Sequence, residues 1–130
     1  MATGFPSSTG DILTSAMFNG LVCFQDTITD QTADYTAVLT DQYQKIISMN
    51  KATAVAVKIP TNASVAYPIG TVLNILNRGA GTVTISAVTS GTTTIVSAGA
   101  VSASPTLGTA KMAAVVKVAT DTWYCVGAIG

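Results

Sequence analysis

The chain has 130 residues, of which 48% are apolar and only 9% are charged, and its six basic residues balance six acidic ones. A chain of this length can bury one core without disulfides or metal, and a neutral chain without a basic patch is not expected to bind nucleic-acid phosphates. Ordinary globular domains carry about 25% charged residues, so we expect 21 threonines and contacts with other protein chains to cover much of this surface.

Residues 1–33 form the first of two predicted parts, an N-terminal arm. Asp11 is a good N-cap, apolar residues follow at helical spacing, and Asn19-Gly20 interrupts the pattern, which predicts a short helix over residues 12–19. A helix this short is marginal alone, so the arm must dock on its own β-domain or on a neighbouring subunit. The apolar residues predicted to make this contact are Phe5, Ile12, Leu13, Met17, Phe18 and Leu21.

The same segment lacks the marks of a targeting sequence. It has no basic stretch followed by a long apolar core, so no secretory signal is expected. No run of 18 apolar residues occurs anywhere in the chain, which predicts no membrane-spanning helix. We therefore expect synthesis in a cytosol and no membrane partner.

Residues 34–130 form the second predicted part, a β-rich body with period-two alternation. Val83, Ile85 and Ala87 oppose threonines and a serine, and an apolar face of residues 112, 114, 116 and 118 opposes a face that carries Lys111 and Lys117. Strands are predicted near residues 35–39, 44–49, 54–59, 71–77, 82–88, 92–97, 111–118 and 123–129. This spacing favours an all-β fold, a single antiparallel sandwich or barrel of jelly-roll type.

Turn residues separate these predicted strands. Arg78-Gly79-Ala80-Gly81 is typical of a hairpin loop in which glycine supplies a positive φ. Residues 119–122 form a short polar loop before Trp123. Trp123 and Tyr124 are adjacent on one strand and therefore face opposite ways, so we expect one of them in the core and the other at its edge or at an interface.

The residue types that catalysis and metal binding need are scarce. The chain has no histidine and no glutamate, which removes the commonest general bases and zinc ligands. Asp26, Asp30 and Asp34 recur every four residues, but without the order of a calcium loop, so a solvated linker is favoured over a cation site. Cys23 and Cys125 are interpreted as small buried hydrophobes, with a bridge between them as the alternative. No catalytic residue, metal site or cofactor is predicted, and the chain is not expected to be an enzyme.

The ordered set of strand and turn signals resembles a known module. The chain has Tyr35-Thr36 with Asp41 after it, an apolar strand that ends in Pro60, Pro68-Ile69-Gly70, a Gly79-to-Ile85 segment and a closing Asp121-Thr122-Trp123. Over residues 34–127 it resembles the structural β-module of tailed bacteriophages that is found in capsid decoration (cement) proteins and in head or tail fibres. Residues 5–19 resemble, more weakly, the attachment segments of some phage fibre proteins.

The resemblance implies a virion component that forms homotrimers. A decoration protein of this kind sits on the capsid surface and binds adjacent subunits of the major capsid protein, with residues 1–33 as the arm. A short head or tail fibre, or a tail adaptor, is the alternative. A carbohydrate-binding module with Tyr67, Trp123 and Tyr124 as stacking aromatics is a second alternative.

Overall fold

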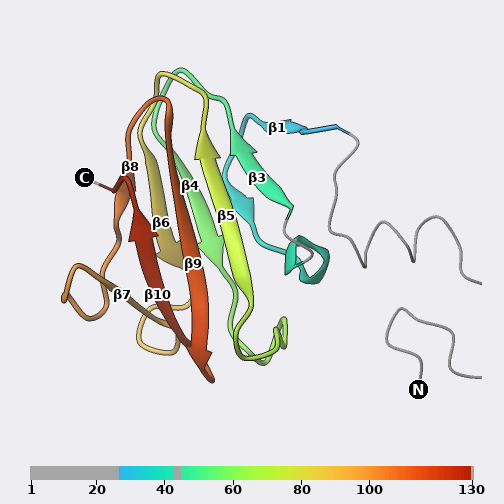
Figure 1. Ribbon diagram of the computed structural model, residues 1–130, viewed down its shortest axis with the longest axis vertical. Helices are drawn as coiled ribbons and strands as arrows, with labels where there is room; N and C mark the ends of the chain where they lie inside the picture. The colour runs from blue at the N-terminus through green and yellow to red at the C-terminus, as the bar shows by residue number, and fades with distance from the viewer. Residues whose placement is uncertain (1–26, 43–44, 130) are drawn as a thin grey trace, which may run out of the picture.

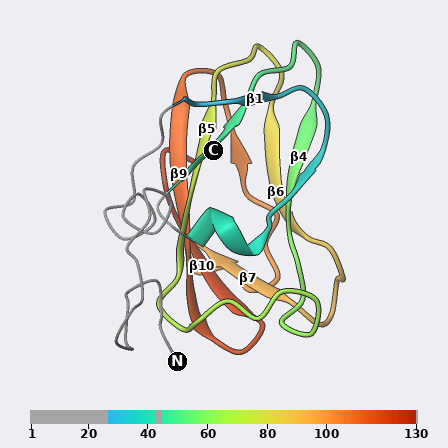
Figure 2. The same ribbon diagram turned by 90° about the vertical axis from the view of Figure 1, so that its right-hand side faces the viewer.

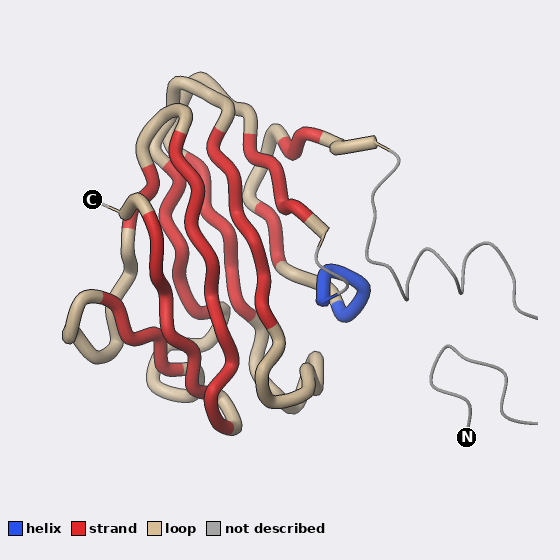
Figure 3. Tube along the Cα trace, in the orientation of Figure 1, coloured by secondary structure: helices blue, strands red, loops and turns tan. Residues whose placement is uncertain are grey.

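The computed structural model describes residues 27–42 and 45–129. These residues form ten strands and one 3-10 helix, η1 (Leu39–Gln42), which is blue in Figure 3. No helix in these ranges is long and apolar enough to cross a membrane. The strands are β1 (Asp30–Gln31), β2 (Tyr35–Thr36), β3 (Ile46–Met49), β4 (Val55–Ile59), β5 (Val72–Asn77), β6 (Val83–Ala87), β7 (Thr94–Ser97), β8 (Thr106–Leu107), β9 (Lys111–Ala119) and β10 (Thr122–Gly127).

The strands make two sheets that pack face to face. The six-stranded sheet has the order β1-β3-β5-β9-β10-β7, and the four-stranded sheet has the order β2-β4-β6-β8. Figure 1 looks onto the larger sheet, with β5, β9 and β10 in front of β4 and β6, and Figure 2 shows the two layers from the side. The predicted all-β sandwich is therefore confirmed.

Alternating side chains build the core between the sheets. β4 and β5 alternate buried and half-buried positions along their whole length, as strands with one covered face do. The ring of Trp123 meets the ring of Tyr67 edge to face, with centroids 5.5 Å apart. The fully buried core includes Met49, Val57, Ile59, Leu73, Ile75, Val83, Ile85, Ile95, Leu107, Val115 and Trp123.

The prediction of antiparallel sheets is wrong, because both sheets are mixed. From β1 to β9, each strand lies in the sheet opposite to the strand before it. Strands of one sheet are thus separated by a strand of the other, and β3 runs parallel to β5, as β4 does to β6. Only β9 and β10 are consecutive strands joined by an antiparallel hairpin, with Asp121 at φ 54° in its turn. Period-two alternation identifies a strand with one buried face, but it does not specify the direction of its neighbours.

The predicted hairpin at residues 78–81 is also wrong. This segment is a β-arch, a connection between strands of different sheets, and it stacks on the arch formed by residues 50–54; Figure 1 shows the two side by side. The amides of Arg78 and Gly81 donate to the carbonyls of Met49 and Lys51, each at 2.8 Å. A Cβ at Gly79 or at Gly81 would overlap the backbone of the arch formed by residues 50–54. These glycines are needed for close backbone approach and not for a positive φ.

Buried polar side chains occupy inward positions that the alternation marks as core. Asn77, the last residue of β5, donates from Nδ2 to the carbonyls of Gly81 and Leu107, both at 2.9 Å, and accepts from the amide of Gly79. It thereby ties the arch to both sheets. On β9, the face that carries Lys117 is the core face, beside Ala113 and Val115, while Met112 and Val118 are exposed. The alternation thus separates the two faces of β9 correctly, but the buried face is the one with the lysine.

The predicted strands correspond to β2 to β7, β9 and β10, with boundaries that differ by a few residues. β1, β8 and η1 are not predicted, because two-residue strands and a single turn of helix leave no periodic pattern. β1 pairs with β3, so residues that precede position 34 contribute to the sandwich. The predicted helix over residues 12–19 lies outside the described residues.

Candidate functional site

Five neighbouring strands of the six-stranded sheet, β3, β5, β9, β10 and β7, carry no charged side chain on the outer face of that sheet. On each strand these residues alternate with the core positions, so they point away from the four-stranded sheet. Their side chains are aliphatic, aromatic, thioether, hydroxyl or amide groups. We call this set the apolar face: Ile46, Ser48, Val72, Asn74, Leu76, Thr94, Val96, Met112, Ala114, Val116, Val118, Thr122, Tyr124 and Val126.

The strand register places the apolar residues of this face in continuous rows. One row runs across four strands through residues 72, 116, 124 and 96, and the next joins Ala114 and Val126, with the amide of Asn74 at its end. The exposed fractions are 40% for Met112, 45% for Val118, 47% for Tyr124 and 55% for Val126. Single exposed apolar residues are ordinary, but a contiguous apolar area marks an interaction site.

The outer face of the four-stranded sheet has a different composition. Its outward positions on β4, β6 and β8 carry hydroxyl groups, one alanine and one lysine. The register places Thr36 beside Lys58 and Thr84 beside Thr106. The sandwich is therefore asymmetric. One broad face is hydroxyl-rich and includes Lys58, whereas the other carries no charge on β3, β5, β9, β10 and β7 and has a charged pair, Asp30 and Arg78, only beside its edge strand β1 among the described residues.

The residues that the sequence singled out as contacts are not described by the structure. Phe5, Ile12, Leu13, Met17, Phe18 and Leu21 all lie outside residues 27–129, so their predicted role stays a prediction. Of the three aromatics proposed to stack on sugars, Tyr67 and Trp123 are 3% and 1% exposed. Only Tyr124 reaches the surface. Trp123 and Tyr124 do face opposite ways, with the tryptophan in the core, as predicted.

Asp30 has a structural environment. Its carboxylate accepts hydrogen bonds from Ser48 Oγ at 2.6 Å, from Asn50 Nδ2 at 3.0 Å and from Arg78 Nη1 at 3.1 Å. The hydrogen bonds from Ser48 and Asn50, followed by the charge of Arg78, lower the pKa of Asp30. Asp34 accepts from the amide of Ala56. Within the described ranges, no three acidic or cysteine side chains lie close enough to hold a metal ion.

A second carboxylate, Asp41, is the buried residue of η1. It accepts from Tyr35 Oη at 2.8 Å and from the amide of Val38 at 2.9 Å. Burial, together with the hydrogen bond from its hydroxyl to Asp41, raises the pKa of Tyr35 well above its usual range. Burial, with the nearby charge of Asp41, does the same for Tyr67, whose hydroxyl donates to the carbonyl of Val38. These hydrogen bonds tie η1 and the residue before it to β2 and to Tyr67.

Cys125 is a buried free thiol. Burial raises its pKa to about 11, so the reactive thiolate is scarce at neutral pH. The prediction of a small buried hydrophobe is confirmed for this cysteine. Cys23 lies outside the described residues.

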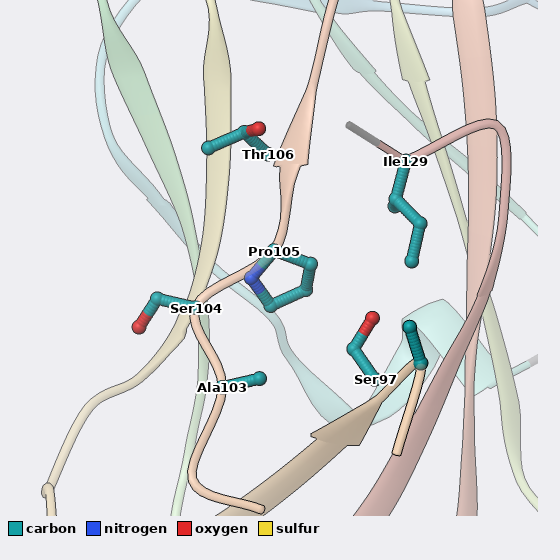
Figure 4. Close-up of a pocket in the computed structure, with 7 residues that line it drawn as sticks. Ser97, Ala103, Ser104, Pro105, Thr106 and Ile129 are labelled. Carbon is teal, nitrogen blue, oxygen red and sulfur yellow. The ribbon is translucent and has the colours of Figure 1, made fainter. Parts of the chain in front are cut away.

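A cavity of about 310 Å³ opens between the end of β7 and the segment that leads into β8. Figure 4 shows Pro105 and Ile129 on opposite sides of it, with Ser97 below. Its other lining residues are small or hydroxylated, and none of them is ionisable: Ala98, Ala103, Ser104 and Thr106. The cavity therefore combines apolar walls with a few hydroxyl groups.

Comparison of the chain with protein-family models, with curated proteins and with solved structures finds no match. The functional assignment therefore depends on the residues and the geometry described above.

Proposed function

We propose that this chain is a virion structural protein that assembles through its apolar face, most specifically a capsid decoration protein whose homotrimers bind the major capsid protein on the head surface. The proposed assembly depends on one observation: five neighbouring strands of the six-stranded sheet, β3, β5, β9, β10 and β7, present an outer face without charge, and a hydroxyl-rich face lies on the opposite side of the same small sandwich. The resemblance of residues 34–127 to phage structural modules is the reason for proposing that the assembly is part of a virion.

The chemistry of the apolar face suits a protein interface. Interface cores are depleted of charge and enriched in tyrosine and methionine, and Tyr124 and Met112 both lie on this face. Apolar area removed from water contributes roughly 25 cal/mol per Å². Association through this face also leaves no charged side chain to desolvate, which is consistent with a chain of only 9% charged residues.

The structure gives less support to a carbohydrate-binding module and does not by itself separate a decoration protein from a fibre or adaptor. A sugar-binding platform needs exposed aromatic rings, and two of the three candidates are in the core. A head fibre, tail fibre or adaptor remains the alternative, because such a protein would assemble through the same kind of face. Quantitative mass spectrometry of purified virions separates the two. A copy number close to that of the major capsid protein supports decoration, whereas the copy number of a tail component supports the alternative.

Charge insertion tests the interface directly. Tyr124→Lys and Val126→Lys each place an ammonium in the centre of the apolar face, and Thr84→Lys places the same group on the outer face of the four-stranded sheet as a matched control. We expect the first two variants to weaken self-association at least tenfold, which corresponds to about 1.4 kcal/mol, and Thr84→Lys to leave it unchanged. Sedimentation velocity over a concentration series measures this. Equal association of all three variants would contradict the proposed interface.

A further inference from the structure

Lys117 is a buried lysine on β9, with 2% of its surface exposed. Its Nζ donates to Asn62 Oδ1 at 2.5 Å and to the carbonyl oxygen of Tyr67 at 2.7 Å. Among the described residues, no carboxylate forms an ion pair with it. A buried ammonium without a counter-charge is costly, so this lysine calls for an explanation other than surface solubility.

Asn62, the partner of Lys117, is fixed in place from the other side. Its backbone amide donates to Asp121 Oδ1 at 2.7 Å, and the same carboxylate oxygen accepts from Thr93 Oγ1 at 3.2 Å. Asn62 belongs to the connection between β4 and β5, and Asp121 belongs to the turn between β9 and β10. The asparagine is thus held between two residues of the β9–β10 hairpin.

The backbone of Lys117 is fixed as well. Its amide donates to the carbonyl of Thr71 at 2.9 Å, and its carbonyl accepts from the amide of Gly70 at 2.7 Å. The connection between β4 and β5 therefore binds the main chain and the side chain of Lys117. A buried primary amine and a part-buried carboxamide are thus held in hydrogen-bond contact. Well-oriented intramolecular reactions reach effective concentrations of roughly 10⁵ M, and the contact between Nζ and Oδ1 places the amine beside the carboxamide that it would attack.

We propose that Lys117 and Asn62 join in an intramolecular isopeptide bond. In this step the neutral amine Nζ of Lys117 attacks Cγ of Asn62, the Nζ–Cγ bond forms and the Cγ–Nδ2 bond breaks. One proton of the amine passes to the departing Nδ2 group, which leaves as ammonia. If the lysine begins as an ammonium, its additional proton leaves with the ammonia as an ammonium ion. No oxidant, metal or external reagent is needed.

The bond would replace a buried charge by a neutral amide. It would also close a covalent loop between β9 of the six-stranded sheet and the β4–β5 connection, which links the two sheets. A cross-link constrains the unfolded chain in the way that a disulfide does. It does so without cysteine chemistry, and so it would persist in a reducing cytosol.

The mass of the intact chain tests this inference. We expect the purified, folded protein to be lighter than its sequence by one ammonia molecule, and a protease digest to contain a branched peptide that joins Asn62 to Lys117. Lys117→Arg and Asn62→Ala should both restore the full mass. Lys58→Arg, at a half-buried lysine on the outer face of β4, is the matched control and should keep the mass deficit.

Ammonia is also lost when an Asn–Gly step forms a succinimide, and Asn19-Gly20 is such a step. The Lys117→Arg variant separates the two, because a succinimide deficit would remain in it. Full mass in folded wild-type protein after prolonged incubation at mildly alkaline pH would overturn the proposal, as would a deficit that persists in Lys117→Arg. If that variant does not fold, the wild-type mass and the branched peptide decide the question alone.

Discussion

Asp30 shows how single polar residues organise the edge of this sandwich. It lies on the two-residue strand β1 and binds Ser48 of β3 and both Asn50 and Arg78 at the stacked arches. The sequence spacing of the aspartates indicated only a solvated linker or, as the alternative, a cation site. The structure gives Asp30 three donors, because β1 folds back onto the six-stranded sheet.

The lowered pKa of Asp30 predicts a specific dependence of stability on acid. A carboxylate whose pKa is lower in the folded state contributes stability above its ordinary value of 3.8 and loses it as the pH falls through the lowered value. Asp30→Asn should therefore be less stable than wild type at neutral pH, and the difference should shrink as the pH falls toward about 3. Urea unfolding at a series of pH values measures it. A difference that stays constant across this range would contradict the assignment.

At the scale of elements, the stacked arches decide how β3, β4, β5 and β6 are arranged. The arch of residues 78–81 approaches the arch of residues 50–54 so closely that a methyl group at Gly81 would overlap the carbonyl group of Thr53. Backbone cannot move aside as a flexible side chain can. The alternation of the chain between the two sheets thus depends on small residues in the arch of residues 78–81.

Gly81→Ala is therefore expected to destabilise the protein by about 3 kcal/mol, in the upper range for overpacked sites. Gly108→Ala is the matched control, because a Cβ there would meet only the side chain of Lys111 at ordinary contact distance, 3.6 Å or more. Its effect should stay within about 0.5 kcal/mol. Thermal or urea unfolding of both variants measures the difference. Similar stabilities would show that the arches are not in close contact.

The same elements show what the sequence can and cannot predict. Strands such as β4 and β5 were located because alternation requires only a local pattern of apolar side chains. Strand direction was not predictable, since Gly79 and Gly81 look the same in a hairpin and in an arch. Lys117 could not be recognised as a buried residue, because the alternation of β9 placed it opposite the apolar row of residues 112, 114, 116 and 118. The apolar face could not be recognised before the register of five strands brought its rows together.

At the scale of the whole molecule, the two broad faces of the sandwich differ in what they can contact. The four-stranded sheet presents hydroxyl groups and Lys58, which water solvates well. Strands β5, β9, β10 and β7 of the six-stranded sheet present a largely apolar area without charge, which is better covered by another protein surface. A chain with zero net charge has little electrostatic repulsion to oppose such association.

The mass of the purified full chain under native conditions tests this account most directly. The chain has a mass of 13.2 kDa, and the proposed homotrimer would have three times that mass. Native mass spectrometry should show a species of three chains that gives way to monomers when Tyr124 is replaced by lysine. A single 13.2 kDa species at every protein concentration, for wild type as for the variant, would contradict the proposal that the apolar face is an interface between copies of the chain.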